Sequence, residues 1–159
     1  MVMTNFLVGL PVMALCLVVQ VGVAVWSVRY CVRQLVEAPA RRGFLAKMSP
    51  LVVAMLAMMG GTLVQIAVWG ALFVGLGEFD EFYEAIYHSG VNFTSLGYGD
   101  VVMSKIWKLL GPLEAVNGIL MLGMTGAAMM AIVQQLIRVQ RDAHAENDRA
   151  DLHRTDSRA

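Results

Sequence analysis

The chain has 159 residues, of which 58% are apolar and 15% are charged, and its formal net charge is zero. Together with a mean hydropathy of +0.64, this composition argues against an ordinary soluble domain. The apolar residues gather in three blocks, 6–28, 48–77 and 109–137, which contain a single charged residue, Glu114. A helix of about 20 apolar residues crosses a bilayer, so each block predicts a transmembrane span.

The first block predicts a span that is retained in the protein. A cleaved signal peptide is the alternative, but it would carry a basic N-terminal region, and residues 1–28 contain no Lys or Arg. We expect Cys16 near the middle of the bilayer and Cys31 near its cytoplasmic face, so a disulfide between them is not expected.

The basic residues predict how the chain crosses the membrane. They gather in the connection 29–47 and again in the tail 138–159, whereas the connection 78–108 is mainly acidic. The positive-inside rule places both basic segments in the cytoplasm. We therefore expect a multi-pass protein of the cell membrane, with its N-terminus outside and its C-terminus in the cytoplasm.

The second block and the segment after it predict two different helices. Ser49 is the expected N-cap of the second span, because Pro50 suits the first helical position. The segment 80–93 is too short and too acidic to span, and Asp80 is its expected N-cap. We expect it to re-enter the membrane from the outer face, which requires surrounding protein.

The segment 94–100 carries the chemistry, and it reads Thr-Ser-Leu-Gly-Tyr-Gly-Asp. Gly97 and Gly99 can adopt positive φ without steric cost, whereas the residue between them cannot do so easily. A backbone that alternates in hand turns successive carbonyls to the same side. Four such chains around an axis would form a cage of oxygens, which can replace the hydration shell of K⁺.

A span, a short helix, the motif T-x-x-G-Y-G-D and a further span together resemble the tetrameric potassium channel pore. The resemblance covers residues 50–137 and implies an all-α membrane protein, with three transmembrane helices, a re-entrant pore helix and a filter loop, assembled as a homotetramer. It divides the chain into an N-terminal span with a basic loop (1–47), a pore domain (48–137) and a charged cytoplasmic tail (138–159). Within the pore domain it implies an outer helix, a pore helix (80–93), a filter (94–100) and an inner helix (106–137).

The resemblance also implies which residues hold the ion. The filter comprises Thr94, Ser95, Leu96, Gly97, Tyr98, Gly99 and Asp100. K⁺ would bind to the backbone carbonyls of Ser95, Leu96, Gly97 and Tyr98 and to the Ser95 hydroxyl, and Asp100 would brace the outer mouth. Three positions depart from the usual motif: Ser95 stands for Thr, Leu96 for Val or Ile, and His88 for Trp. We expect a less rigid filter and an altered bracing hydrogen bond at His88.

Glu114 is a candidate for supporting the filter from behind. An ionisable group inside a span is typically functional or paired. We expect its partner to be Ser89 or Asn92 on the pore helix, or the nearby Asn117. The alternative is a carboxylate that reaches the outer interface and has no such role.

The last span supplies further candidates. Gly118 and Gly123 are possible hinges, with close helix packing as the alternative interpretation. The cavity below the filter is expected to be lined by four residues of one face: Ile119, Leu122, Thr125 and Met129.

These patterns predict a passive, potassium-selective channel and no enzyme. Ser95 and Leu96 leave a weakly selective cation channel as one alternative, and a non-conducting, pore-like regulatory subunit is another. The intact glycine pair argues against the second. We expect no cofactor and no nucleic-acid partner; the expected partners are K⁺, the lipid bilayer and further copies of the chain.

Overall fold

The computed structural model describes residues 2–36 and 44–156, and within these residues it contains helices and the turns between them but no strand. The helices are α1 (Val2–Val36), α2 (Phe44–Gly75), α3 (Phe82–Phe93) and α4 (Leu110–Asp156). Three helices are long and apolar enough to cross a membrane, over Val2–Gln34, Met48–Gly75 and Leu110–Val139. The all-α architecture and the three predicted spans are therefore confirmed.

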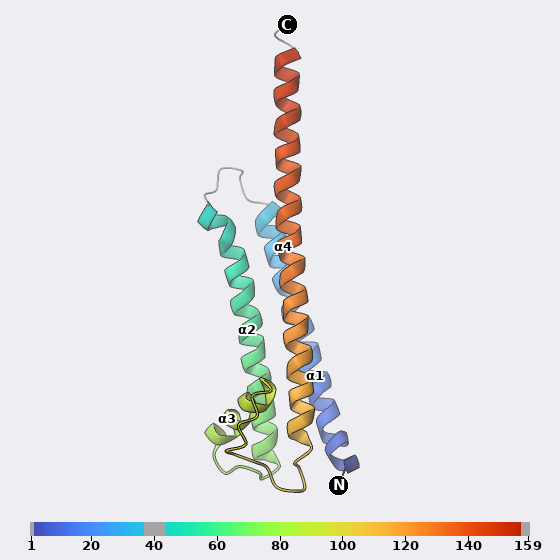
Figure 1. Ribbon diagram of the computed structural model, residues 1–159, viewed down its shortest axis with the longest axis vertical. Coiled ribbons are helices and arrows are strands. Elements are labelled where there is room, and N and C mark those ends of the chain that lie inside the picture. Colours follow the sequence, from blue (N-terminus) through green and yellow to red (C-terminus); the bar gives the residue numbers. More distant parts are fainter. Residues whose placement is uncertain (1, 37–43, 157–159) are drawn as a thin grey trace.

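The three long helices run side by side, and the short α3 lies at the end of the bundle that carries the N-terminus (Figure 1). The first helix is an integral part of the bundle, because it packs along both α2 and α4, which contact each other over a much shorter stretch. One apolar cluster joins Cys16 of α1 to Trp69 and Phe73 of α2, and extends to Phe93 of α3. A second cluster lies farther from α3 and includes Ala24, Ala54, Met58 and Ile132.

Two predicted helix starts are wrong. The second helix begins at Phe44, so Ser49 is not its N-cap and Pro50 lies inside it. The residues before Ser49 include Leu, Ala and Lys, which favour helix and extend it backwards. For α3, the N-cap is Glu81 in an extended conformation, without a side-chain capping bond, and not Asp80.

The inner helix also differs from its predicted range, 106–137. It begins at Leu110, after a turn that ends at 109, and this start fits the position of Pro112 in the first helical turn, where no N–H is needed. It then continues without interruption to Asp156, far beyond the other helices (Figure 1). The tail, as far as Asp156, is thus a helical extension of the last span.

Candidate functional site

The short helix α3 is held by close backbone contacts on both sides. A Cβ atom added at Gly70 of α2 would lie 3.2 Å from the backbone nitrogen of Ile86. A Cβ atom added at Gly118 of α4 would lie 1.9 Å from the carbonyl oxygen of Phe93, which no side chain could tolerate. Glycine at these two positions lets the backbones of α2 and α4 approach α3 closely. The contact at Gly118 positions Phe93, the last residue of α3.

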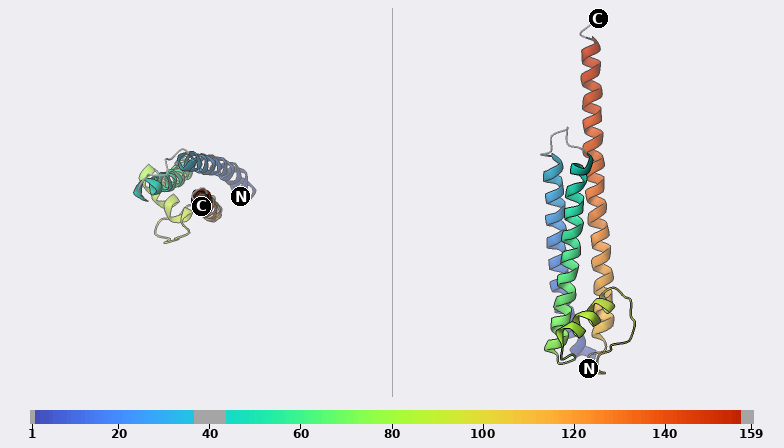
Figure 2. Two further views of the ribbon diagram at one scale, coloured as in Figure 1. Left: turned by 90° about the horizontal axis from the view of Figure 1, so that it is seen from above. Right: turned by 90° about the vertical axis from the view of Figure 1, so that its left-hand side faces the viewer.

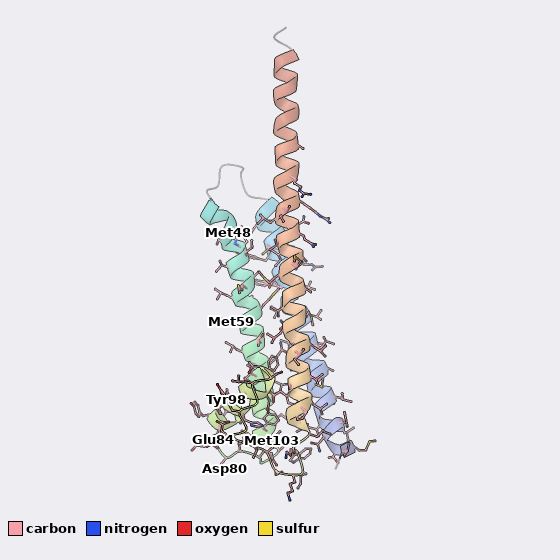
Figure 3. All side chains as sticks on the ribbon, viewed as in Figure 1. Met48, Met59, Asp80, Glu84, Tyr98 and Met103 are labelled. Carbon is pink, nitrogen blue, oxygen red and sulfur yellow. The ribbon has the colours of Figure 1, made fainter. Side chains whose placement is uncertain are left out.

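The segment that follows α3 turns back at once. The Ser95 N–H donates to the Asn92 carbonyl over 2.8 Å, and the Leu96 N–H donates to the Val91 carbonyl over 2.9 Å. The loop then extends beside α4 (Figure 2). Figure 3 places Tyr98 at the same end of the molecule as Asp80 and Glu84, and Met48 far from them, near the other end of α2.

The backbone of this segment alternates in hand. Gly97 and Gly99 have φ of 60° and 72°, the positive values that their lack of a side chain allows. Ser95 also has positive φ, 59°, which sequence reasoning did not anticipate because serine avoids this region. With every second residue left-handed, the intervening carbonyls face one side of the segment.

All seven residues from 94 to 100 are exposed in the single chain, and Tyr98 is 68% exposed. The subunit therefore presents this segment on its surface and does not enclose it. In a bilayer, non-helical backbone of this kind is tolerated only where protein buries it or where it lines a water-filled cavity.

Two side chains of α3 hold the end of the segment. The Tyr87 hydroxyl donates to Asp100 Oδ2 over 2.6 Å, and this bond lowers the pKa of Asp100 and raises that of Tyr87. His88 Nδ1 lies 2.9 Å from the Val101 carbonyl, and Asn92 Nδ2 lies 2.8 Å from His88 Nε2. Because the carbonyl can only accept, Nδ1 carries the proton and Nε2 accepts from Asn92, so a neutral His88 is fully bonded.

Tyr87 was missed in the sequence, although it directly precedes His88. A second missed pair is Glu78 and Ser104. The Ser104 hydroxyl donates to Glu78 Oε1 over 2.6 Å, and its backbone N–H donates to Glu78 Oε2 over 2.5 Å. This contact joins the connection before α3 to the connection after the filter segment.

Glu114 lies behind α3 and is fully buried, so it does not reach an outer interface. Its Oε1 atom lies 2.5 Å from the Ser89 hydroxyl oxygen, and that same oxygen lies 2.8 Å from the Ile66 carbonyl. A hydroxyl has one hydrogen and can donate to only one of these acceptors. Both contacts are hydrogen bonds only if Glu114 is a carboxylic acid that donates to Ser89 while Ser89 donates to Ile66. Of the partners expected from the sequence, Ser89 and Asn92 both make side-chain hydrogen bonds with it.

The inner-helix candidates separate into two groups. Ile119 and Leu122 are 59% and 51% exposed, as expected of cavity residues. The other two are half-buried and contact the rest of the subunit. Thr125 is hydrogen-bonded to Gln20 of α1, and Met129 packs against the second apolar cluster, so their place in a cavity stays a prediction. For Gly118 the contact with α3 supports close packing, whereas Gly123 has no atom within 4 Å of an added Cβ and remains a hinge candidate.

A family model described as an ion channel matches residues 51–135, more than half of the chain. The chain belongs to this ion channel family. The matched part runs from α2 through α3 and the filter segment into α4. No curated protein and no solved structure gives a significant match.

The protein is therefore a multi-pass membrane protein that functions as a passive ion channel, and its family is not one of enzymes. A channel domain of this kind forms an oligomer in the membrane. The whole of α1 precedes the matched part, although α1 packs against both of its long helices.

Proposed function

We propose that four copies of the chain form a potassium-selective channel through which K⁺ moves down its electrochemical gradient. The observation that carries this proposal is the alternation of backbone hand at Ser95, Gly97 and Gly99 in an exposed segment. In a fourfold assembly, the carbonyls of Ser95, Leu96, Gly97 and Tyr98 form successive rings of oxygens that replace water around K⁺.

The surroundings of the filter support a cation. Helix α3 ends at Phe93, directly before the filter, and the C-terminal end of a helix carries partial negative charge. At the outer mouth, the bond from Tyr87 lowers the pKa of Asp100, so this carboxylate is charged at neutral pH. Both features favour K⁺ over anions along the path.

The bonds at the outer end of the filter support selectivity. Asp100 and Val101 are tied to α3 through Tyr87 and His88, so the outer end of the filter is held on a helix. A filter held in this way keeps its oxygens in place although Ser95 lacks the methyl group of threonine. The proposed topology puts this end, with the N-terminus, outside the cell, and the C-terminal tail in the cytoplasm.

Flux through liposomes containing the purified protein tests the proposal. Wild type is expected to pass K⁺ and to exclude Na⁺. Gly97→Ala and Gly99→Ala are expected to abolish K⁺ flux while the protein still inserts, because alanine resists positive φ at both positions. Gly90→Ala is the matched control: Gly90 lies in α3 just before the filter, and an added Cβ meets nothing within 4 Å.

Normal selective flux in both filter variants would contradict the filter assignment. Equal passage of K⁺ and Na⁺ by wild type would identify a weakly selective cation channel. No flux of either ion would favour a regulatory subunit.

A further inference from the structure

Three polar side chains inside the bundle join the three spans to one another. Gln65 Nε2 of α2 donates to Gln20 Oε1 of α1 over 2.7 Å, and Gln20 Nε2 donates to the Thr125 hydroxyl oxygen of α4, also over 2.7 Å. The Thr125 hydroxyl in turn donates to the Met121 carbonyl over 3.0 Å. Gln65, Gln20 and Thr125, called here the glutamine–threonine chain, thus form one directional series of hydrogen bonds.

The bonds of the glutamine–threonine chain are costly to break because of where these side chains lie. Gln20 and Gln65 are fully buried, and a bilayer offers no water to replace a lost partner. Thr125 has already used its hydroxyl hydrogen on Met121, so Gln20 is the donor that occupies its oxygen. If α4 moves away from α1 at this level, the Gln20 amide loses its partner.

The inner helix is easiest to bend at the same level. A threonine that bonds to the carbonyl four residues earlier tends to bend its helix. Gly123 and Gly126 flank Thr125, and an added Cβ meets nothing within 4 Å at either glycine. By contrast, the part of α4 around Gly118 is pressed against the Phe93 carbonyl and cannot move independently of α3. Bending is therefore favoured between 121 and 126.

We propose that Gln20 is a positioning residue that holds the inner helix at this bend point, and that the first span thereby regulates opening of the pore. The inference rests on the proposed function, because it concerns the regulation of that same pore. The bond between Gln20 and Thr125 exists in only one of two arrangements of α4, so it biases the equilibrium between them. The donor, Gln20, lies on α1, which precedes the matched channel domain, so α1 adds a regulatory contact to that domain.

Single-channel recording of K⁺ current in planar bilayers tests this role. Gln20→Leu and Thr125→Val are each expected to shift the open–closed equilibrium in the same direction, by about three- to tenfold, as measured strengths of interhelical hydrogen bonds imply. The double variant is expected to shift gating no further than Gln20→Leu alone, since both substitutions remove the bond between Gln20 and Thr125, and Gln20→Leu also removes the bond from Gln65. Thr125→Ser keeps the hydroxyl and is expected to behave as wild type.

Thr62→Val is the matched control. The Thr62 hydroxyl donates to the Met58 carbonyl four residues earlier, over 3.2 Å, and Thr62 is half-buried like Thr125. Among the described residues no side chain of another span donates to it, so its removal is expected to leave gating unchanged. If Thr62→Val shifted gating as much as Thr125→Val, the proposal would be overturned.

A second measurement separates this inference from the proposed function. Spin labels at Arg138→Cys report the distance between inner helices in the assembled protein, whether or not current flows. Gln20→Leu and Thr125→Val are expected to change this distance distribution, and Thr62→Val is not. If wild type passes no K⁺, the proposed function fails, but the label distances still decide the role of Gln20.

Wild-type gating or wild-type label distances in Gln20→Leu would overturn the role of Gln20. Thr125→Val removes the same bond by an isosteric change, and it decides the question if Gln20→Leu does not assemble.

Discussion

Glu114 shows how one buried side chain can connect three helices. Through Ser89 it joins α4 to α3, and Ser89 also contacts the Ile66 carbonyl of α2. If Ser89 donates to Ile66, its contact with Glu114 needs a donor on Glu114, and this condition determines which substitution preserves both contacts. A glutamine can donate in the same place, whereas an alanine cannot.

Glu114→Gln is therefore expected to keep most of the stability of the assembled protein, and Glu114→Ala is expected to lose about 1–3 kcal/mol per polar group left unpaired. The alanine also leaves a cavity behind the filter, which adds to the loss. Thermal unfolding at several K⁺ concentrations measures both effects, with K⁺ flux as the functional readout. Wild-type stability and flux in Glu114→Ala would mean that the residue does not support the filter.

The bond between Tyr87 and Asp100 predicts a dependence on external pH. The bond lowers the pKa of Asp100 below its ordinary value of 3.8. The carboxylate that accepts this bond is therefore fully charged above pH 3.8, and its charge is lost as the pH falls through the lowered pKa. K⁺ flux is expected to fall in strong external acid as Asp100 is protonated and its negative charge at the outer mouth is lost. Tyr87→Phe removes the cause of the lowering, so the midpoint of this fall is expected to move to higher pH.

Two further variants isolate the bond. Asp100→Asn has no carboxylate and is expected to lose the step in acid altogether. Tyr83→Phe makes the same change as Tyr87→Phe, on an exposed residue of α3 for which the structure shows no hydrogen bond to Asp100, and is expected to keep the wild-type midpoint. A midpoint that is identical in Tyr87→Phe and wild type would show that the bond does not govern the acid response.

At the scale of elements, the contact between α3 and α4 depends on Gly118. An alanine there would place its Cβ 1.9 Å from the Phe93 carbonyl oxygen, and this backbone atom cannot yield as a flexible side chain would. Gly118→Ala is expected to destabilise the protein by about 1–3 kcal/mol or more, the usual cost of overpacking. Gly123→Ala, with nothing within 4 Å, is the control and is expected to unfold at or above the wild-type temperature.

Thermal unfolding of both variants in detergent measures the difference. Equal unfolding temperatures for Gly118→Ala and Gly123→Ala would contradict the close packing of α3 against α4.

The spans were predictable from the sequence because a long apolar run crosses a bilayer as a helix. All backbone groups must bond within the segment, and a helix satisfies them. The ends were less predictable, because weak propensities and local caps decide them. Ser49-Pro50 is typical of a helix start, yet helix-favouring residues before it carry α2 back to Phe44.

The backbone of the segment 94–100 could be predicted in part for a similar reason. Gly97 and Gly99 are permissive by themselves, so the sequence indicates where positive φ can occur. Positive φ at Ser95 depends on the alternation of the whole segment, which no single residue signals. Asp100, the partner of Tyr87, and Ser104, the partner of Glu78, lie 13 and 26 residues farther along the chain, and only the fold brings them close.

The contacts of Thr125 and Met129 within the subunit could not be predicted, for a reason at the same scale. Which residues of α4 face a cavity depends on where α1 packs, and periodicity within α4 does not contain that information. Gln20 draws Thr125 toward α1, and Met129 follows it into the cluster around Met58. Ile119 and Leu122 remain on the surface of the subunit.

Across the whole molecule, charge and shape are arranged along one axis. The filter segment, the N-terminus and the acidic residues Asp80 and Glu84 lie at one end (Figures 1 and 3). The C-terminus lies at the other, as three spans require. The basic residues Arg29 and Arg33 belong to the last turns of α1, away from the filter. This polarity agrees with a cytoplasmic position of the basic end.

Cysteine labelling tests the orientation directly. Cys16 and Cys31 are buried, so the native thiols are expected to give little background with an impermeant reagent. A cysteine at Thr4, which is exposed near the start of α1, is expected to react from outside intact cells. A cysteine at Ser157, just beyond the described residues, is expected to react only after the cells are permeabilised. Labelling of Ser157→Cys but not of Thr4→Cys in intact cells would reverse the topology, and with it the side from which K⁺ meets the filter.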